Sequence, residues 1–233
     1  MPETIALKNV ISLVGDYPVL AGINFDAKSG EVILLRGSNG SGKTSLLRLV
    51  AGLIPVSKGS ARVLGISLDG SSGNQIRSEI GYLGHKLPIY YDLTGHDNIK
   101  YFLSIRLSQL DMSKQTEKKG RDYLKAISDE ALELVGLSMK LGKERTGNLS
   151  HGQKKRLALA PILWSKPRIL LLDEPHSGLD ESSRAVIDQL VLDAANNGTT
   201  VIYSSHELEA NEKMPTRVIS LAGGRVVEDK PNV

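Results

Sequence analysis

The chain has 233 residues, of which 40% are hydrophobic and 24% are charged, a composition typical of a globular protein with a sizeable core. Its 29 basic and 26 acidic residues leave a net charge of only +3, without the dense basic stripe of a nucleic-acid-binding protein, so we expect no nucleic-acid partner. The lack of cysteine excludes disulfides, cysteine-ligated zinc or iron–sulfur clusters, and thiol catalysis.

No apolar run reaches the ~18–20 residues that a bilayer-spanning helix needs. The N-terminal sequence MPETIALKNVISLVGD carries an acid and lacks a basic segment leading into an apolar core, so we expect no signal peptide. If the protein works at a membrane, we therefore expect it to do so from the side, through a partner.

The N-terminal part of the chain predicts two kinds of β-structure. Residues 5–13, 19–27 and 61–64 are short, mixed segments separated by turns, and they indicate an antiparallel sheet. Residues 32–35 are a compact apolar run, followed by a glycine-rich stretch and then by residues 43–50, whose apolar positions have helical spacing. This order predicts a strand, a glycine-rich turn and a helix.

The middle of the chain, residues 95 to about 165, predicts helices. The sequence Thr94-Gly95-His96-Asp97 fits a capping box at the start of the first helix. Residues 129–135 indicate another helix that ends at Gly136, and the charged residues 114–125 indicate a solvated face.

The last third of the chain predicts a strand, a helix and a strand over residues 169–172, 182–196 and 201–203. The first of these strands is an uninterrupted apolar run, which is typical of a strand buried on both faces in a parallel sheet. Strand, helix and strand in this order indicate a right-handed parallel crossover. Residues 217–221 and 225–228 flank two glycines and predict a hairpin.

These segments together predict one α/β domain over residues 1–233, with a mainly parallel sheet, an N-terminal antiparallel β part and an inserted helical part. We assign residues 1–85 and 166–233 to the core and residues of about 86–165 to the insertion.

The segment Gly37-Ser38-Asn39-Gly40-Ser41-Gly42-Lys43-Thr44 matches the phosphate loop G-x-x-x-x-G-K-[ST], and with Ser45 it forms the predicted ATP-binding segment. Its glycines let backbone N–H groups turn inward around an anion, and the following helix adds positive potential at its N-terminus. Lys43 would reach the β- and γ-phosphates, and Thr44 would offer its hydroxyl to Mg²⁺. The flanking strand and helix favour a P-loop NTPase core over an ordinary glycine-rich turn.

Two carboxylates, Asp173 and Glu174, follow the apolar run 169–172. Ligands of parallel sheets bind at the carboxyl ends of the strands. Asp173 can hold Mg²⁺ through water, and Glu174 can take a proton from an attacking water. The alternative is an acidic turn after a strand.

A third segment, Asn148 to Gln153, precedes a predicted helix over residues 154–163 and by itself could be a helix N-cap. Its order and spacing relative to other motifs are more specific. Together with the phosphate loop, Asp173-Glu174, Ser177-Gly178-Leu179-Asp180 and His206, it resembles the ATP-binding cassette (ABC) family over nearly the whole chain.

The resemblance implies that two subunits, identical or similar, bind two ATP molecules in head-to-tail contact. The signature Leu149-Ser150-His151-Gly152-Gln153 of one subunit would meet the γ-phosphate held by the phosphate loop of the other, through the Ser150 hydroxyl and the Gly152 amide. His206 matches the switch histidine at the γ-phosphate, and Asp180 lies in the loop that links the two sites. Tyr17 matches the aromatic residue that stacks on adenine, unless it is a tyrosine of a surface turn.

The resemblance also implies that hydrolysis of ATP, with Mg²⁺ as cofactor, powers transport through an integral-membrane permease subunit. The chain would then lie at the cytoplasmic face of the cell membrane, attached through the permease. Residues 85–91 are expected to form the contact.

Three residues depart from the family pattern. His151 replaces the first glycine of LSGGQ, while Ser150 and Gly152 are kept. His85 stands where the family has a glutamine that senses magnesium and the membrane partner, and it either replaces that glutamine in part or is a turn residue. Pro161 lies inside the signature helix and predicts a kink, because proline lacks the N–H and clashes with the carbonyl one turn earlier.

Gly84-His85, residues 92–94 and Asn98 are similar to the ATPase subunit of the haem exporter of cytochrome c maturation, so we expect an exporter, with other exporter ATPases as close alternatives. Two other classes stay open. One is a soluble ABC ATPase without a transporter, of the iron–sulfur cluster assembly type. The other is a nucleotide sensor that does not hydrolyse ATP, against which Lys43, Glu174 and His206 argue.

Overall fold

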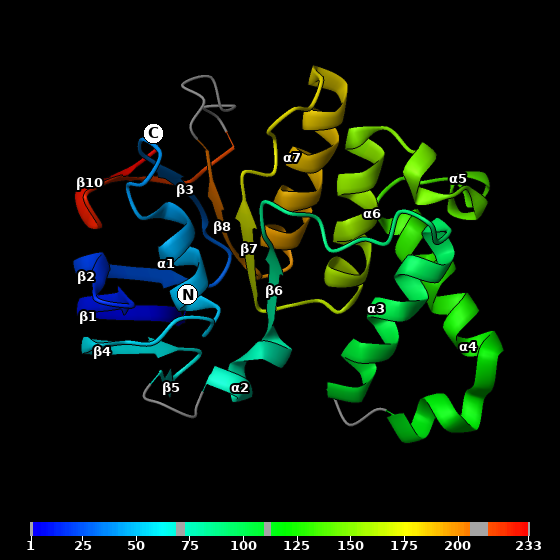
Figure 1. Ribbon diagram of the computed structural model, residues 1–233, viewed down its shortest axis with the longest axis horizontal. Helices are drawn as coiled ribbons and strands as arrows, with labels where there is room; N and C mark the ends of the chain where they lie inside the picture. The colour runs from blue at the N-terminus through cyan, green and yellow to red at the C-terminus, as the bar shows by residue number, and fades with distance from the viewer. Residues whose placement is uncertain (1, 69–72, 110–112, 206–213, 233) are drawn as a thin grey trace. The chain divides into compact units, whose positions relative to one another are not determined.

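The computed structural model describes residues 2–68, 73–109, 113–205 and 214–232, and the chain divides into two compact units (Figure 1). The first unit comprises Met1–His85, Arg168–Ser177 and Val191–Val233, and the second comprises Lys86–Pro167 and Gly178–Leu190. Within the described ranges, no helix combines the length and the apolar character that crossing a bilayer requires.

Two β-sheets build most of the first unit. One is antiparallel, in the order β2-β1-β4-β5, and the other has six strands in the order β10-β9-β3-β8-β7-β6. The elements of this unit are β1 (Glu3–Val14), β2 (Tyr17–Lys28), β3 (Val32–Arg36), α1 (Lys43–Val50), β4 (Lys58–Val63), β5 (Ile66–Ser67), α2 (Gly73–Ile76), a 3₁₀ turn (Arg77–Glu79), β6 (Ile80–Leu83), β7 (Ile169–Asp173), β8 (Thr200–Ser204), β9 (Arg217–Ala222) and β10 (Arg225–Pro231).

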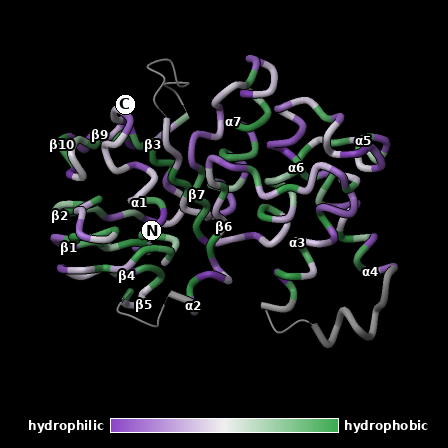
Figure 2. The backbone as a smooth tube through the Cα atoms, viewed as in Figure 1, coloured by the Kyte–Doolittle hydropathy of each residue, from purple (hydrophilic) through white to green (hydrophobic). Residues whose placement is uncertain are grey.

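The six-stranded sheet is parallel except for β10, which pairs antiparallel with β9. Every residue of β7 and β8 is buried, which explains why the apolar runs 169–172 and 201–203 within them show no alternation. Figure 2 shows this concentration of hydrophobic residues along β7. The predicted α/β class, with a mainly parallel sheet and an antiparallel N-terminal sheet, is confirmed.

Helix α1 packs in the core of the first unit, with contacts to β2, β7 and β8. Its side chains Leu46, Leu47, Leu49 and Val50 are fully buried and join one cluster with residues of β1, β2, β3 and β7. Burying a side chain of this size stabilises the fold by about 1.5–3 kcal/mol. The helix that follows the phosphate loop is thus fixed by its own apolar face.

The strand register brings two loops to one edge of the six-stranded sheet. Leu35 of β3 and Asp173 of β7 both align with Ser204 at the end of β8, which lies between them. Because these strands are parallel, the segments that follow β3 and β7 both leave the sheet at its carboxyl edge. This edge is where ligands of parallel sheets bind.

The second unit is helical. It contains α3 (Gly95–Gln109), α4 (Ser113–Leu134), α5 (Met139–Lys143), a 3₁₀ turn (Thr146–Asn148), α6 (His151–Trp164) and the first part of α7 (Glu181–Asn196), which continues into the first unit. Thr94 caps α3 as expected, since its hydroxyl accepts the Asp97 N–H at 3.1 Å. Helix α6 continues through the buried Pro161.

Helix α4 is longer than the sequence predicts. It includes the charged residues 114–125 as well as residues 129–134. The physical reason is that Lys, Gln and Glu have high helix propensity, so a charged run can extend a helix whose apolar face begins later.

We predict that Leu171→Ala, a change in the middle of β7, lowers the free energy of unfolding by about 2–5 kcal/mol, because it removes a fully buried side chain and leaves a cavity. Urea denaturation followed by circular dichroism measures the effect. Leu53→Ala is the matched control, since Leu53 is 48% exposed and its loss should cost less than about 0.5 kcal/mol. Equal effects of the two changes would contradict the assigned core.

Candidate functional site

The phosphate loop connects β3 to α1, and its glycines adopt backbone conformations that other residues disfavour. Gly37, Gly40 and Gly42 have φ angles of 148°, 77° and 109°. A Cβ atom on Gly37 would lie only 2.4 Å from the carbonyl oxygen of Leu221. The positive φ angles therefore favour glycine at all three positions, and at Gly37 a side chain would also clash with the backbone of β9.

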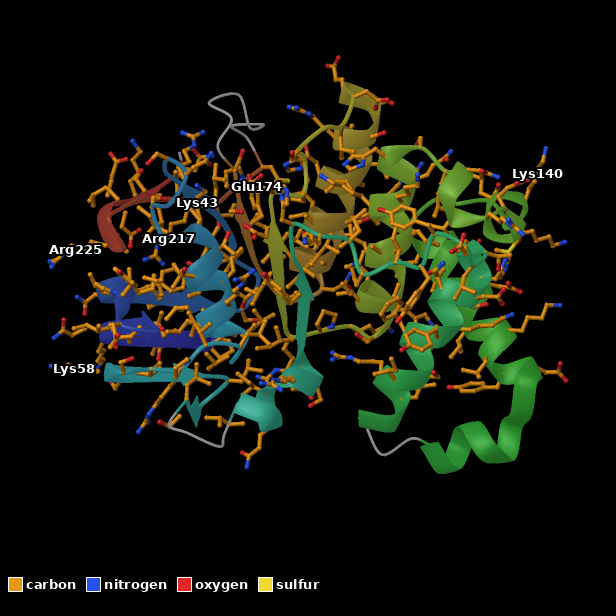
Figure 3. All side chains as sticks on the ribbon, in the orientation of Figure 1. Lys43, Lys58, Lys140, Glu174, Arg217 and Arg225 are labelled. Carbon is orange, nitrogen blue, oxygen red and sulfur yellow. The ribbon has the colours of Figure 1, made fainter. Side chains whose placement is uncertain are left out.

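Lys43 is held against this loop. Its Nζ donates to the carbonyl oxygens of Gly37 at 2.6 Å and Ser38 at 3.0 Å, and the residue is only 5% exposed. A buried ammonium next to the N-terminus of α1 makes this region attractive to an anion. Figure 3 shows Lys43 and Glu174 in the first unit.

Thr44, the first residue after Lys43, contacts the end of β7. Its hydroxyl donates to the carboxylate of Asp173 at 2.9 and 3.1 Å. The Ser204 hydroxyl donates to the same carboxylate at 2.7 Å from the end of β8. These bonds join the start of α1 to the ends of β7 and β8 at the carboxyl edge of the sheet, and they bring together two of the predicted site residues, Thr44 and Asp173.

Glu174 has an unusual backbone. Its φ of 56° lies in the left-handed region, which costs a side chain of this kind about 1–2 kcal/mol. The conformation is held from both sides, because the Glu174 N–H donates to Ser204 Oγ at 3.0 Å and its carbonyl accepts the Ser177 N–H at 3.2 Å. Strain of this kind clusters at functional sites.

His85 follows β6, the neighbour of β7, and lies at the same carboxyl edge of the sheet. Its Nδ1 lies 3.7 Å from Glu174 Oε2, while its side chain is 70% exposed. That separation is too long for a hydrogen bond, and an exposed pair contributes little to stability. The structure thus places His85 next to Glu174.

The donor atoms at this edge fit one class of metal ion. Thr44 and Asp173 present oxygen atoms, the ligands that Mg²⁺ prefers, whereas the imidazole of His85 suits softer metals. Thr44 and Asp173 therefore match a magnesium site, and His85, which the sequence also suggested as a metal residue, does not share their chemistry.

Two further residues at this edge, Ser204 and Tyr82, carry no signal of a site role in the sequence. Ser204 is fully buried and bonds to both Asp173 and Glu174, which no local pattern in the sequence reveals. Burial raises the pKa of the Tyr82 phenol, and the nearby charge of Asp173 raises it further, although a hydrogen bond with Arg48 lowers it. Tyr82 therefore stays neutral beside the carboxylate.

Tyr17 begins β2, directly after the turn from β1, and its side chain is 79% exposed. Such a ring takes no part in the core and is accessible to a ligand. The structure adds nothing on the predicted switch residue His206, which lies outside the described ranges.

In the second unit, the signature residues form the start of α6. Ser150 is the N-cap, its hydroxyl accepts the Gln153 N–H at 3.2 Å, and the Gln153 side chain accepts the Ser150 N–H at 2.9 Å. This is a complete capping box. Leu149 before it is buried, whereas Ser150 and His151 are exposed at the end of the helix.

The start of α6 packs against the start of α7. A Cβ atom on Gly152 would lie 2.5 Å from Ser183 Oγ, so only glycine allows this approach. Asp180 caps α7, because its carboxylate accepts the Ser183 N–H at 2.7 Å and the Ser182 hydroxyl at 2.9 Å. These bonds, led by that from the Ser183 N–H, lower the pKa of Asp180. No local sequence pattern identifies Ser183 as a partner of the signature helix.

The segment before the signature is bonded to the loop before α3. Gly147 N–H donates to the Tyr91 carbonyl, and Thr146 N–H donates to the Leu93 carbonyl, each at 2.9 Å. Asn98, 1% exposed, donates to the Thr146 hydroxyl at 2.9 Å and accepts the Tyr90 N–H at 2.7 Å. This network fixes residues 90–94 relative to the signature.

Comparison with known proteins agrees with these motifs. Residues 20–177 match the ABC transporter family. The chain is 35% identical over 230 residues to the glutamate/aspartate import ATP-binding protein GltL of Escherichia coli K12, covering 97% of this chain and 90% of that protein. It is 30% identical over 220 residues to the linearmycin resistance ATP-binding protein LnrL of Bacillus subtilis 168, covering 94% of this chain and 67% of that protein.

Solved structures agree on the fold. A dimeric ATP-binding cassette in a post-hydrolysis state, bound to ADP and Pi, superposes with a TM-score of 0.83 at 24% identity, covering 98% of this chain and 99% of that one. CbiO1 of Clostridium perfringens, part of an ABC transporter complex, superposes with a TM-score of 0.83 at 26% identity, covering 100% of this chain and 90% of that one. The chain belongs to the ABC transporter family and is an ATP-binding subunit with ATPase activity.

Proposed function

We propose that the chain pairs with a second cassette when ATP binds, and that hydrolysis of this ATP powers a membrane permease. The observation that carries the proposal is the 2.9 Å hydrogen bond between Thr44 of the phosphate loop and Asp173, the residue next to Glu174. It brings a phosphate-binding loop and a candidate general base to one edge of the first unit.

In this proposal, the N–H groups of residues 37–45 and the ammonium of Lys43 bind the phosphates. Lys43 exchanges its bonds to the Gly37 and Ser38 carbonyls for the phosphate oxygens, which bear more negative charge. A Mg²⁺ held by Thr44 and Asp173 would neutralise phosphate charge when bound.

Glu174 acts as the general base. Its carboxylate orients the attacking water and accepts its proton, and the bonds that hold its backbone fix the point from which the side chain leaves the main chain. In this scheme His85 lies beside the general base, with its ring 3.7 Å from the Glu174 carboxylate. His206 completes the site at the γ-phosphate by resemblance to the family, and Tyr17 stacks on adenine.

The signature of one chain acts on the ATP of the other. Ser150 is exposed at the N-terminus of α6, where the helix dipole favours an anion, and the amide of the buried Gly152 belongs to the same first turn. Asp180 lies in the loop that links the two sites. ABC cassettes dimerise, and the solved cassette described above is a dimer, which supports this arrangement.

The second unit carries an exposed aromatic surface that we assign to the permease. It consists of Tyr90, Tyr91 and Leu93 before α3 and of Tyr101 and Ile105 on α3, which are 38–56% exposed. The Tyr90 and Tyr101 rings pack edge to face with centroids 5.2 Å apart. Tyrosine is enriched at protein interfaces, because its side chain has an apolar ring and a polar hydroxyl. Binding there would hold the chain at the cytoplasmic face of the membrane.

Only a few residues give evidence about the direction of transport and the cargo. His85 and its neighbours resemble the haem exporter ATPase, which favours haem export as a hypothesis. The relatives named above include an import protein and a resistance protein at similar identity. Overall sequence similarity therefore identifies neither the direction of transport nor the cargo of this chain.

We predict that Lys43→Ala weakens ATP binding about 10- to 100-fold, because a charged hydrogen bond contributes about 1.5–3 kcal/mol. Isothermal titration calorimetry measures the affinity. Lys58→Ala is the control, since Lys58 is an exposed lysine on β4 of the same unit. If Lys43→Ala binds ATP as tightly as Lys58→Ala does, the phosphate-loop assignment is wrong.

We predict that Glu174→Gln slows hydrolysis strongly and traps an ATP-bound dimer. Glutamine keeps the shape of the side chain but is a far weaker base than a carboxylate, and it removes negative charge next to the γ-phosphate. Bound ATP then stabilises the paired state by mass action. In size-exclusion chromatography the variant should elute near twice 25.2 kDa with ATP and as a monomer with ADP.

The matched control adds Ser150→Arg to Glu174→Gln. Arginine at the exposed N-cap of α6 would block the opposite phosphate site without entering the core, so the double variant should stay monomeric in ATP. A dimer that tolerates Ser150→Arg would contradict the head-to-tail arrangement.

We predict that a photo-crosslinking amino acid at Tyr101 captures an integral-membrane protein in the source cell. The same probe at Met139, which is similarly exposed on α5 and outside the aromatic surface, should not. Crosslinks of equal yield from both positions, or from Met139 alone, would contradict the assignment of this surface.

A further inference from the structure

We propose that Gly224, in the turn between β9 and β10, is a positioning residue for the phosphate loop. The inference rests on the proposed role of residues 37–45 in binding phosphate. It assigns a function in nucleotide binding to a C-terminal hairpin that lies more than a hundred residues from the loop in sequence.

The hairpin reaches the loop because of the strand register. Strand β9 pairs parallel with β3, with Arg36 aligned with Ser220, so the end of β9 continues beside the start of the phosphate loop. Gly223 and Gly224 then turn the chain into β10 with φ angles of 53° and 71°. Two positive φ angles in a two-residue turn are those of a type I′ hairpin. Arg217 and Arg225, labelled in Figure 3, mark the two strands.

Gly224 makes two backbone hydrogen bonds, in opposite directions. Its N–H donates to the carbonyl of Ser41 in the phosphate loop at 2.9 Å, and its carbonyl accepts the Ala21 N–H of β2 at 2.8 Å. One residue thus connects the phosphate loop to the strand that begins with Tyr17. We call this pair of bonds the Gly224 bridge.

The bond to Ser41 determines how the next peptide group points. In a trans peptide the carbonyl and the N–H lie on opposite sides, so holding the Ser41 carbonyl toward Gly224 turns the Gly42 N–H away from the hairpin. Gly42 directly precedes Lys43 and α1. The Gly224 bridge therefore keeps a donor of the anion-binding loop in its orientation before any phosphate arrives, which lowers the ordering cost of binding.

Close packing explains why the bridge needs glycine. A Cβ atom on Gly224 would lie 3.0 Å from the Val19 carbonyl oxygen and 3.1 Å from Leu20 Cα. A Cβ atom on Gly42 would lie 3.2 Å from Gly224 Cα. Gly223 differs, since a Cβ atom there would meet nothing within 4 Å although its φ is also positive. The two glycines of the turn therefore offer a matched pair of variants.

The experiment compares Gly224→Ala with Gly223→Ala in the full chain. Both put alanine at a left-handed position, but only Gly224→Ala pushes the hairpin away from β2 and the loop. We expect Gly224→Ala to weaken binding of ADP and of inorganic tripolyphosphate about tenfold by calorimetry, and to raise the KM for ATP with kcat within about twofold. Gly223→Ala should bind both probes within about twofold of the unchanged chain.

Tripolyphosphate has no adenine, so its affinity reports on the phosphate loop alone. Loss of ADP affinity with unchanged tripolyphosphate affinity would overturn the proposal, because the effect would then come from Tyr17. An equal loss of affinity in Gly224→Ala and Gly223→Ala would also overturn the proposal, because backbone strain in the turn would then explain the effect without the Gly224 bridge. Failure of Lys43→Ala to weaken either probe would overturn the phosphate-loop assignment, and this inference with it.

A second variant decides if Gly224→Ala does not fold. Ala21→Pro removes the N–H that donates to Gly224 on β2, an edge strand, where proline is tolerated. We expect it to weaken tripolyphosphate binding without lowering the unfolding temperature of the nucleotide-free protein by more than a few degrees. Unchanged tripolyphosphate binding in this variant would overturn the proposal.

Discussion

The carboxylate of Asp173 organises the first unit, because hydroxyl groups from two other segments donate to it. Thr44 comes from the start of α1 and Ser204 from the end of β8, and Asp173 itself is 5% exposed. A buried carboxylate is stable only when hydrogen bonds or a positive charge compensate its lost hydration. The same bonds that satisfy Asp173 therefore hold the phosphate loop, β7 and β8 at fixed distances, and the backbone of Glu174 follows through Ser204.

In the second unit, side-chain caps at the N-termini of α6 and α7 satisfy polar backbone groups. Ser150 and Asp180 cap α6 and α7, and Gly152 lets the two ends approach so closely that Ser183 lies against its Cα. The Asn98 network then ties these ends to the loop that carries the exposed tyrosines. The loop with the exposed tyrosines is therefore hydrogen-bonded to the residues just before the signature.

Much of this fold could be predicted because its signals are local. The apolar run of β7, the helical spacing after Lys43 and the glycine pair of the last hairpin each define an element within a few residues. The extent of α4 was not predicted, since its charged half has no apolar period. Ser204, Ser183 and Gly224 could not be found either, because each acts on a residue that is distant in sequence, and only the register of the strands or the packing of the helices brings them together.

With Glu174 as the proposed general base, its left-handed backbone gives activity and stability opposite requirements at one position. Glycine or asparagine would adopt this conformation with less strain, so a chain selected for thermal resistance alone would tend to lose the acid there. A glutamate in this strained conformation is explained by the proposed general-base role and not by any gain in folding stability.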